Sequence, residues 1–319
     1  MTSTTARTAA PPATKRLGDR VFSGTALGAG ITILVLLAAV TFFLVVQGIP
    51  GIFADPAQAA TTLGNSGGFW PYVGPLVFGT VWASLLALLM AVPLALGIAL
   101  YITHYAPRAL STALGYAIDL LAAVPSIVYG LWGSFVLAPA VQPVYSWLVD
   151  NMGWFPLFAG PVSASGRTIL TAAIVLAVMV IPIVTAISRE IFLQTPALHE
   201  EAALALGATR WEMVRMAVLP FARPGIISGA MLGLGRALGE TMAVALVLSA
   251  TGVITFQLLT SNNPTTIPAN IALKFGEAGY GLNVNVLIAT GLILFVITFA
   301  VNAFARYIVN RRKDFSGAN

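Results

Sequence analysis

Six long apolar stretches dominate this chain of 319 residues, separated by segments that carry most of its polar and charged residues. Each stretch is long enough to cross the hydrocarbon core of a membrane as an α-helix, which takes about 20 residues. They predict an all-α membrane protein with six transmembrane helices, at about 22–46, 75–102, 114–138, 168–187, 225–249 and 285–305. Hydrophobic residues make up 58% of the chain and charged residues 8%, which excludes a soluble globular domain.

The basic residues are distributed unevenly over the segments that join these stretches. Thirteen of the 16 lie in the two tails and in the second and fourth joining segments: Arg7, Lys15, Arg16, Arg20, Arg108, Arg189, Arg210, Arg215, Arg223, Arg306, Arg311, Arg312 and Lys313. The positive-inside rule therefore predicts that both termini and these two segments are cytoplasmic. The same asymmetry explains the net charge of +5. The basic residues can bind anionic membrane lipid, so no nucleic-acid partner is expected.

Three regions are expected along the chain. Residues 1–20 predict a disordered basic tail, because they are short of apolar residues. Residues 21–310 predict a single transmembrane domain, and residues 311–319 a second basic tail.

The fourth joining segment begins with a predicted short helix. Thr195 is a suitable N-cap, and Pro196 suits the first helical position. Residues 197–206 are strong helix formers. Glu200 and Glu201 fall early in this helix, where its dipole favours negative charge, and Glu201 is expected to be exposed near the following turn.

A tight turn and a second helix are predicted next. Gly207 is the expected stop of the first helix, because the left-handed conformation costs glycine nothing. Thr209 and Glu212 form a T-x-x-E capping box that begins a second helix, which is expected to end before Pro220. The segment at about 195–220 therefore predicts a rigid elbow that can enter a groove on a partner and transmit motion.

The fifth apolar stretch contains two charged residues, Arg236 and Glu240, in the sequence G-R-A-L-G-E-T-M-A. At about 1.5 Å rise per residue, Arg236 lies roughly 17 Å beyond Gly225, near the middle of the membrane. A charge there costs about 2.5–3.5 kcal/mol on insertion scales, so both side chains must face protein, water or each other. Their spacing puts them on one helical face. Three interpretations stay open: a buried Arg–Glu pair that fixes packing, a direct role in anion passage, and a gate.

The chemistry of this pair suits a tetrahedral oxyanion. The planar fork of an arginine donates two hydrogen bonds to neighbouring oxygens. The carboxylate of Glu240 could hold the fork in place and accept a hydrogen bond from a protonated anion. Such a site would favour hydrogen phosphate over sulfate, which carries no proton at neutral pH.

Other polar or helix-breaking residues lie near predicted helix ends. Asp119 either faces Arg236 from a neighbouring helix or lies at the cytoplasmic interface, and the second interpretation is favoured. Pro125 predicts a kink in the third helix. His104 and His199 are interpreted as solvated histidines rather than as ligands or proton relays.

Two sets of motifs resemble those of known membrane permeases. The fourth joining segment resembles the EAA loop of ABC-importer permeases, which it matches with Glu201, Ala202, Ala203, Gly207, Leu219 and Pro220. The sequences G-R-A-L-G-E-T-M-A at 235–243 and V-P-S-I-V-Y-G-L-W-G at 124–133 resemble the phosphate-specific permeases of ABC importers, of the PstC type. The resemblance covers the chain from the second helix to the sixth.

This resemblance implies a MetI-like ABC importer permease fold in a bacterial inner membrane, acting as the channel subunit of an ATP-driven phosphate importer. It implies a heterodimer with a homologous PstA-type permease, two PstB-type ATPase subunits and an external PstS-type phosphate-binding protein. ATP and Mg would bind the ATPase subunits, and no cofactor is expected on this chain.

The resemblance also carries over to single residues. Arg236 and Glu240 match the charged pair of the phosphate signature, and Glu201 and Gly207 match the ATPase-docking loop. With their neighbours, the predicted substrate pathway comprises Arg236, Glu240, Thr241 and Asp119. The predicted coupling segment comprises Glu200, Glu201, Ala202, Ala203, Gly207, Thr209 and Arg210.

No enzymatic activity is expected of the chain itself. A P-loop needs a lysine directly after a glycine, and none of the three lysines, Lys15, Lys274 and Lys313, follows one. The sequence has no cysteine, so thiolate metal sites are excluded. The alternatives are a permease of the same fold for sulfate or molybdate, a proton-coupled secondary transporter using Glu240 and Asp119, and a membrane-embedded enzyme. The secondary transporter leaves the EAA loop unexplained, and the enzyme lacks a nucleophile–base or metal cluster near Arg236.

Overall fold

The computed structural model describes residues 17–64, 66–249 and 251–313, in which all regular structure is helical and no strand occurs. The elements are α1 (Leu17–Ile52), α2 (Ala60–Leu63), α3 (Phe69–Leu100), η1 (Tyr101–Tyr105), α4 (Arg108–Ala123), α5 (Ser126–Trp132), η2 (Gly133–Leu137), α6 (Ala138–Met152), α7 (Ile169–Leu193), α8 (Ala197–Ala205), α9 (Arg210–Met213), η3 (Val214–Val218), α10 (Leu219–Gly239), α11 (Met242–Val247), α12 (Ile267–Phe275) and α13 (Leu282–Lys313). The η elements are π-helical turns. Helical structure reaches into both predicted tails, whose residues 1–16 and 314–319 lie outside the described ranges.

Six helical segments of the described chain are long and apolar enough to cross a membrane: Val21–Ile52, Phe69–Tyr105, Ser126–Met152, Ile169–Leu193, Arg210–Gly239 and Leu282–Tyr307. The prediction of an all-α membrane protein with six transmembrane helices is therefore confirmed. Four of the predicted stretches differ from these segments only at their ends. The third and the fifth differ more, because the backbone bends inside each of them.

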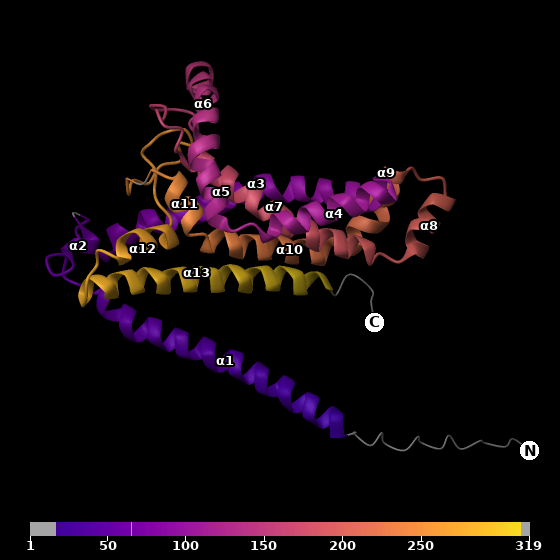
Figure 1. Cartoon of the computed structure of the whole chain (residues 1–319), viewed down its shortest axis with the longest axis horizontal. Helices are drawn as coiled ribbons and strands as arrows, with labels where there is room; N and C mark the ends of the chain where they lie inside the picture. The colour runs from indigo at the N-terminus through magenta and orange to yellow at the C-terminus, as the bar shows by residue number, and fades with distance from the viewer. Residues whose placement is uncertain (1–16, 65, 250, 314–319) are drawn as a thin grey trace, which may run out of the picture.

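The bend in the third stretch lies at Val124 and Pro125, whose backbone is extended, with ψ of 129° and 139°. The kink predicted at Pro125 is confirmed. On one side of it, α4 packs against α7 with Gly115 and Ile118 buried. On the other side the chain continues through α5 and η2 into α6, which projects away from the other helices (Figure 1). The single helix predicted at 114–138 is therefore two helices joined by an extended link.

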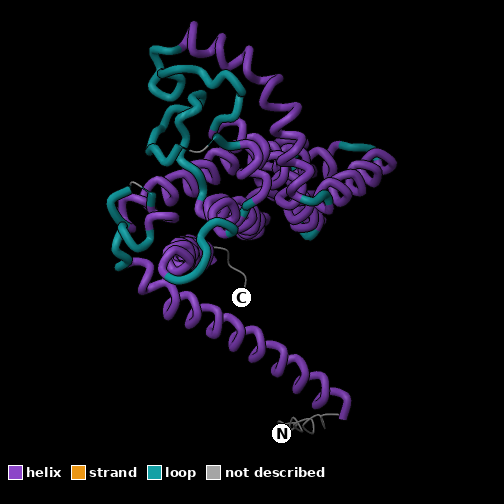
Figure 2. The backbone as a smooth tube through the Cα atoms, turned by 60° about the vertical axis from the view of Figure 1, so that its left-hand side comes forward, coloured by secondary structure: helices purple, strands orange, loops and turns teal. Residues whose placement is uncertain are grey.

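The long helices α3, α7, α10 and α13 form a bundle in which α7 packs against both α3 and α10 (Figure 1). Helices α8 and α9 lie at one end of the bundle, here named the α8 end. Helices α2 and α12 lie at the opposite end, the α12 end (Figures 1 and 2). Helix α1 meets α13 near the α12 end, with Gly48 and Gly51 against Ala289 and Asn285, and then diverges from the bundle.

Small residues let the bundle helices approach one another closely. Helix α3 buries a row of alanines spaced four residues apart: Ala83, Ala87, Ala91, Ala95 and Ala99. Helix α10 presents glycines at the same spacing to α7: Gly225 to Ile191, Gly229 to Ile187, and Gly233 to Val180 and Val184. Close packing of this kind holds helices together in lipid, where the hydrophobic effect between them is absent. The glycine seam therefore fixes the position of α10, the helix that carries Arg236.

Candidate functional site

The first predicted helix of the fourth joining segment is α8, which begins at Ala197. The predicted N-cap at Thr195 is wrong. Pro196 lies between Thr195 and the start of α8 in an extended conformation, with ψ of 125°. Thr195 is therefore one residue too far from the first helical turn to cap it. The Oγ1 atom of Thr195 is buried and has no hydrogen-bond partner among the described residues. Glu201 and Ala202 on α8 are exposed.

The turn after α8 closes at Gly207, as the sequence predicts. This glycine has φ of 86°, in the left-handed region. Its N–H donates to the carbonyl of Leu204 at 3.0 Å, and the N–H of Ala208 donates to the carbonyl of Ala203 at 3.2 Å. Two bonds with this spacing form a Schellman motif, which ties off the last carbonyls of a helix. A Cβ atom at Gly207 would meet nothing within 4 Å, so the backbone conformation, and not lack of space, requires glycine.

The second predicted helix begins with the expected capping box. The N–H of Thr209 donates to Oε2 of Glu212 at 2.8 Å, and the N–H of Glu212 donates to Oγ1 of Thr209 at 3.3 Å. The prediction that this helix ends before Pro220 is wrong, because Arg210–Gly239 is one continuous helical segment. Pro220 is the second residue after the π-turn η3, where the regular hydrogen-bond pattern is already interrupted, so its missing N–H does not end the helix. Arg210, the first residue of the segment, is exposed.

The two adjacent glutamates of α8 have different surroundings. Oε1 of Glu200 lies 3.5 Å from Nε2 of His104, whereas Glu201 is exposed. The side chain of His104 is only 8% exposed, so the interpretation of this residue as a solvated histidine is wrong. The π-turn η1, at the end of α3, places His104 between Phe192 of α7 and Glu200 of α8. His199 is exposed.

Helix α10 ends at Gly239, inside the stretch predicted as the fifth transmembrane helix. Glu240 is extended, with φ of −69° and ψ of 127°, and α11 begins at Met242. Arg236 and Glu240 therefore do not share a helical face. The two side chains form no ion pair within 4.0 Å in the described structure, so the interpretation as a buried Arg–Glu pair has no geometric support.

Glu240 is held by the helix that follows it. It is 8% exposed, and its Oε1 accepts a hydrogen bond from the N–H of Ala243 at 3.0 Å. A carboxylate at this place satisfies a free N–H in the first turn of α11 and interacts favourably with the helix dipole. Thr241 is half-buried, and its hydroxyl donates to the carbonyl of Gly239 at 3.2 Å. Both residues thus stabilise the bend between α10 and α11.

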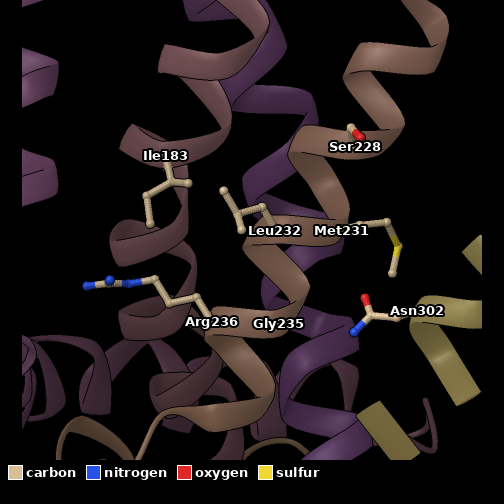
Figure 3. Close-up of a pocket in the computed structure, with 7 residues that line it drawn as sticks. All are labelled: Ile183, Ser228, Met231, Leu232, Gly235, Arg236 and Asn302. Carbon is tan, nitrogen blue, oxygen red and sulfur yellow. The ribbon is translucent and has the colours of Figure 1, made fainter. Parts of the chain in front are cut away.

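Arg236 lines an open pocket of about 460 Å³ together with Ile183, Ser228, Met231, Leu232, Gly235 and Asn302 (Figure 3). Its guanidinium points from α10 past Ile183 and away from Asn302. Its Nε atom is buried and has no hydrogen-bond partner in the described part of the chain. A cation without a partner among apolar helices is costly, and the site therefore favours an anion.

Two polar residues of this pocket were not identified from the sequence. Ser228 lies on α10, and Asn302 lies on α13 and points toward α10 (Figure 3). Polar side chains inside apolar helices are themselves a signal of function, but which helices meet depends on the tertiary fold. Asp119 lies elsewhere: it is exposed on α4, outside the pocket, and forms no ion pair with Arg236 in the described ranges.

Known proteins are similar to this chain over most of its length. A family model described as "Binding-protein-dependent transport system inner membrane component" matches residues 91–314. The chain is 48% identical over 300 residues to the "Phosphate transport system permease protein PstC 2" of Mycobacterium tuberculosis, and the match covers 92% of each chain. It is 43% identical over 316 residues to the "Phosphate transport system permease protein PstC" of Mesorhizobium japonicum, covering 95% of this chain and 93% of the relative.

A solved structure supports the same conclusion for the fold. A bacterial ABC transporter involved in the import of the acidic polysaccharide alginate has a chain that matches this one with a TM-score of 0.59. The match covers 92% of this chain and 96% of that chain, at 19% sequence identity. The architecture is therefore that of a MetI-like ABC importer permease. The chain belongs to the binding-protein-dependent transport system inner membrane components and, among these, to the PstC-type phosphate transport permeases.

Proposed function

We propose that this chain is the channel subunit of an ATP-driven importer of inorganic phosphate. The observation that carries the proposal is Arg236, a cation without a described ion-pair or hydrogen-bond partner that lines a pocket within the bundle. A guanidinium recognises a tetrahedral oxyanion through paired hydrogen bonds, which suits phosphate. The names of the relatives point to the same anion.

The α8 end is proposed to dock the ATPase subunits, which bind ATP and Mg, while this chain binds neither. Its exposed surface includes Glu201, Ala202 and Arg210, and the Schellman motif and the capping box make the elbow rigid. The segment Arg210–Gly239 leads from this elbow to Arg236 as one helix. A movement of the elbow would thus reach the anion pocket without passing a flexible joint, which suits alternation between outward-open and inward-open states.

The assembly proposed around the chain follows the same family. The α8 end and both termini are placed in the cytoplasm of a bacterial cell, because basic residues dominate them. The chain pairs with a homologous PstA-type permease in the inner membrane, and two PstB-type ATPases bind on the cytoplasmic side, at the α8 end. A PstS-type phosphate-binding protein delivers its ligand at the α12 end. Helix α1 buries none of its apolar window within the chain, so lipid or the partner permease must cover it.

Uptake of labelled phosphate tests this function, in cells that lack the chain and in the same cells complemented by it. We expect restored uptake that needs ATP and is insensitive to sulfate and molybdate. Restored uptake of another oxyanion would keep the architecture and reject phosphate as the substrate. Uptake that persists without ATP and follows the proton gradient would contradict coupling to an ATPase.

Arg236→Lys separates recognition from charge. Lysine keeps the positive charge but cannot donate a bidentate pair, so uptake is expected to fall about ten- to a hundredfold. The matched control is Arg108→Lys, since Arg108 is exposed on α4 and lies outside the pocket. Uptake at the wild-type rate in Arg236→Lys would reduce Arg236 to a packing role.

A further inference from the structure

Helix α8 is weakly attached to the rest of the chain by its own side chains. It has nine residues and buries none of them. A helix this short is not stable in water without tertiary contacts. Its partly buried Ala203 packs against the apolar cluster of Phe192, Met213 and Val214, but an alanine contributes little area. Among the described residues, the side chains of α8 make one polar contact to the rest of the chain, between Glu200 and His104.

His104 is held firmly on the α3 side of this contact. Its Nδ1 atom lies 2.6 Å from the hydroxyl of Thr103, which also lies 2.9 Å from the carbonyl of Ala99. The ring meets the ring of Phe192 edge-on, at 6.4 Å between centroids. Only 8% of the side chain is exposed, so the imidazole has little freedom to turn away from Glu200.

The hydrogen bonds of the imidazole determine whether Nε2 directs an N–H group or a lone pair toward Glu200. The hydroxyl of Thr103 donates its proton to the carbonyl of Ala99, so its oxygen accepts from an N–H group at Nδ1. The neutral ring with this proton would turn the lone pair of Nε2 toward the carboxylate. The protonated ring carries a proton on both nitrogens, and its second N–H group faces Oε1 of Glu200 across 3.5 Å. The contact with Glu200 therefore favours the protonated ring. No other charged group comes within 4.0 Å of His104 in the described residues.

We propose that His104 is a positioning residue that fixes helix α8 to the end of α3 through Glu200. This inference rests on the proposed function, because it needs an ATPase that moves α8. Helix α3 packs along α7 through its row of buried alanines, so a displacement of α8 would reach the centre of the bundle. The contact thus provides a second route from the elbow, beside the continuous helix Arg210–Gly239. Glu200 works inside the permease, whereas its neighbour Glu201 faces the partner.

The test uses the whole transporter in proteoliposomes, with both permeases, both ATPases and the binding protein, and measures phosphate taken up per ATP hydrolysed. His104→Ala is expected to lower this ratio about fivefold, because the contact between the imidazole and the carboxylate of Glu200 is lost. His104→Gln keeps a donor near the same place and is expected to stay within about twofold of the wild type. Glutamine also keeps the bulk, so His104→Leu, which has bulk but no donor, is the control and is expected to behave like His104→Ala.

Glu200→Ala and the double variant complete the cycle. If the two residues act through one contact, the double variant is no worse than either single one, and the effects do not multiply. Glu201→Ala is the matched control at the neighbouring position. It is expected to weaken binding of the ATPase. Its effect on uptake is expected to multiply with the effect of His104→Ala, because the two residues make different contacts. Multiplying effects of His104→Ala and Glu200→Ala, or a wild-type ratio in His104→Ala, would overturn the proposal.

Two further readouts separate this proposal from the proposed function. Amide hydrogen exchange of the permease pair without ATPase needs no transport, and His104→Ala is expected to speed exchange in Ala197–Ala205 about fivefold. Unchanged exchange there would overturn the positioning role. Wild-type proteoliposomes that take up no phosphate would instead reject the proposed function, while the exchange experiment would still decide the role of His104.

Discussion

The elbow at the α8 end and the bend between α10 and α11 hold their candidate functional residues in opposite ways. At the elbow, Gly207 and the pair Thr209–Glu212 are exposed, and hydrogen bonds between residues no more than five apart set the backbone. At the bend, Arg236 depends on the glycine seam that seats α10 against α7 and on a pocket that α13 helps to line. One region is built by local chemistry and the other by the packing of distant helices.

This difference indicates how each region responds to change. The turn at Gly207 and the capping box are set locally and keep their shape when the bundle shifts, while the contact between Glu200 and His104 attaches α8 to the bundle. A rigid turn of this kind suits a segment that transmits force. A pocket determined by packing changes when the helices shift, which suits a site that must open and close. Variants at the elbow should therefore affect coupling with little loss of stability, and variants in the glycine seam should destabilise the permease as a whole.

The largest effect is expected for Gly233→Ala in the glycine seam. The added Cβ would lie 2.7 Å from Val180 and 3.0 Å from Val184, so α10 and α7 must separate. Overpacking of this kind costs about 1–3 kcal/mol, seen as a lower midpoint of thermal unfolding in detergent. The control is Gly235→Ala, where a Cβ meets nothing within 4 Å and helix propensity improves by about 1 kcal/mol. Equal midpoints for the two variants would show that the seam does not hold α10.

A smaller effect on stability, but a severe one on uptake, is expected for Gly207→Val. A β-branched residue at φ of 86° costs about 1–2 kcal/mol and would open the Schellman motif. Uptake and co-purification of the ATPase should both be lost while the unfolding midpoint of the permease stays close to wild type. The control, Gly97→Val, is exposed in the regular part of α3, with no contact within 4 Å of the added Cβ. Normal uptake in Gly207→Val would contradict the role of the elbow in docking.

The two regions also differ in how far the sequence predicts them. The stop at Gly207 and the capping box were predicted because each is decided by residues no more than five apart. The same local rules failed at Thr195 and at Pro220. Both rules assume a regular helical backbone next to the residue. At Thr195 the following Pro196 is extended, and before Pro220 the π-turn η3 interrupts the regular hydrogen bonds.

At the bend, the apolar pattern predicted a helix correctly but did not predict that the helix ends at Gly239. The sequence is apolar on both sides of Glu240, so nothing in it marks the change of direction, and the shared face predicted for Arg236 and Glu240 was wrong. The burial of His104 and the approach of Asn302 to α10 were missed for a related reason. Each is decided by a helix that lies far away in the sequence, and periodicity carries no such information.

The smallest effect, and the sharpest test of local control, is expected for Thr209→Ala. The change removes the oxygen that accepts from the N–H of Glu212, and the loss of a cap costs about 1 kcal/mol. Amide exchange should rise several-fold in Arg210–Met213 and stay unchanged in Ile169–Leu193, because the cap stabilises only the first turn of its own helix. Thr209→Ser keeps the oxygen and should match the wild type. If exchange in α7 rose together with that in α9, the elbow would depend on the bundle after all, and the contrast with the bend at Glu240 would not hold.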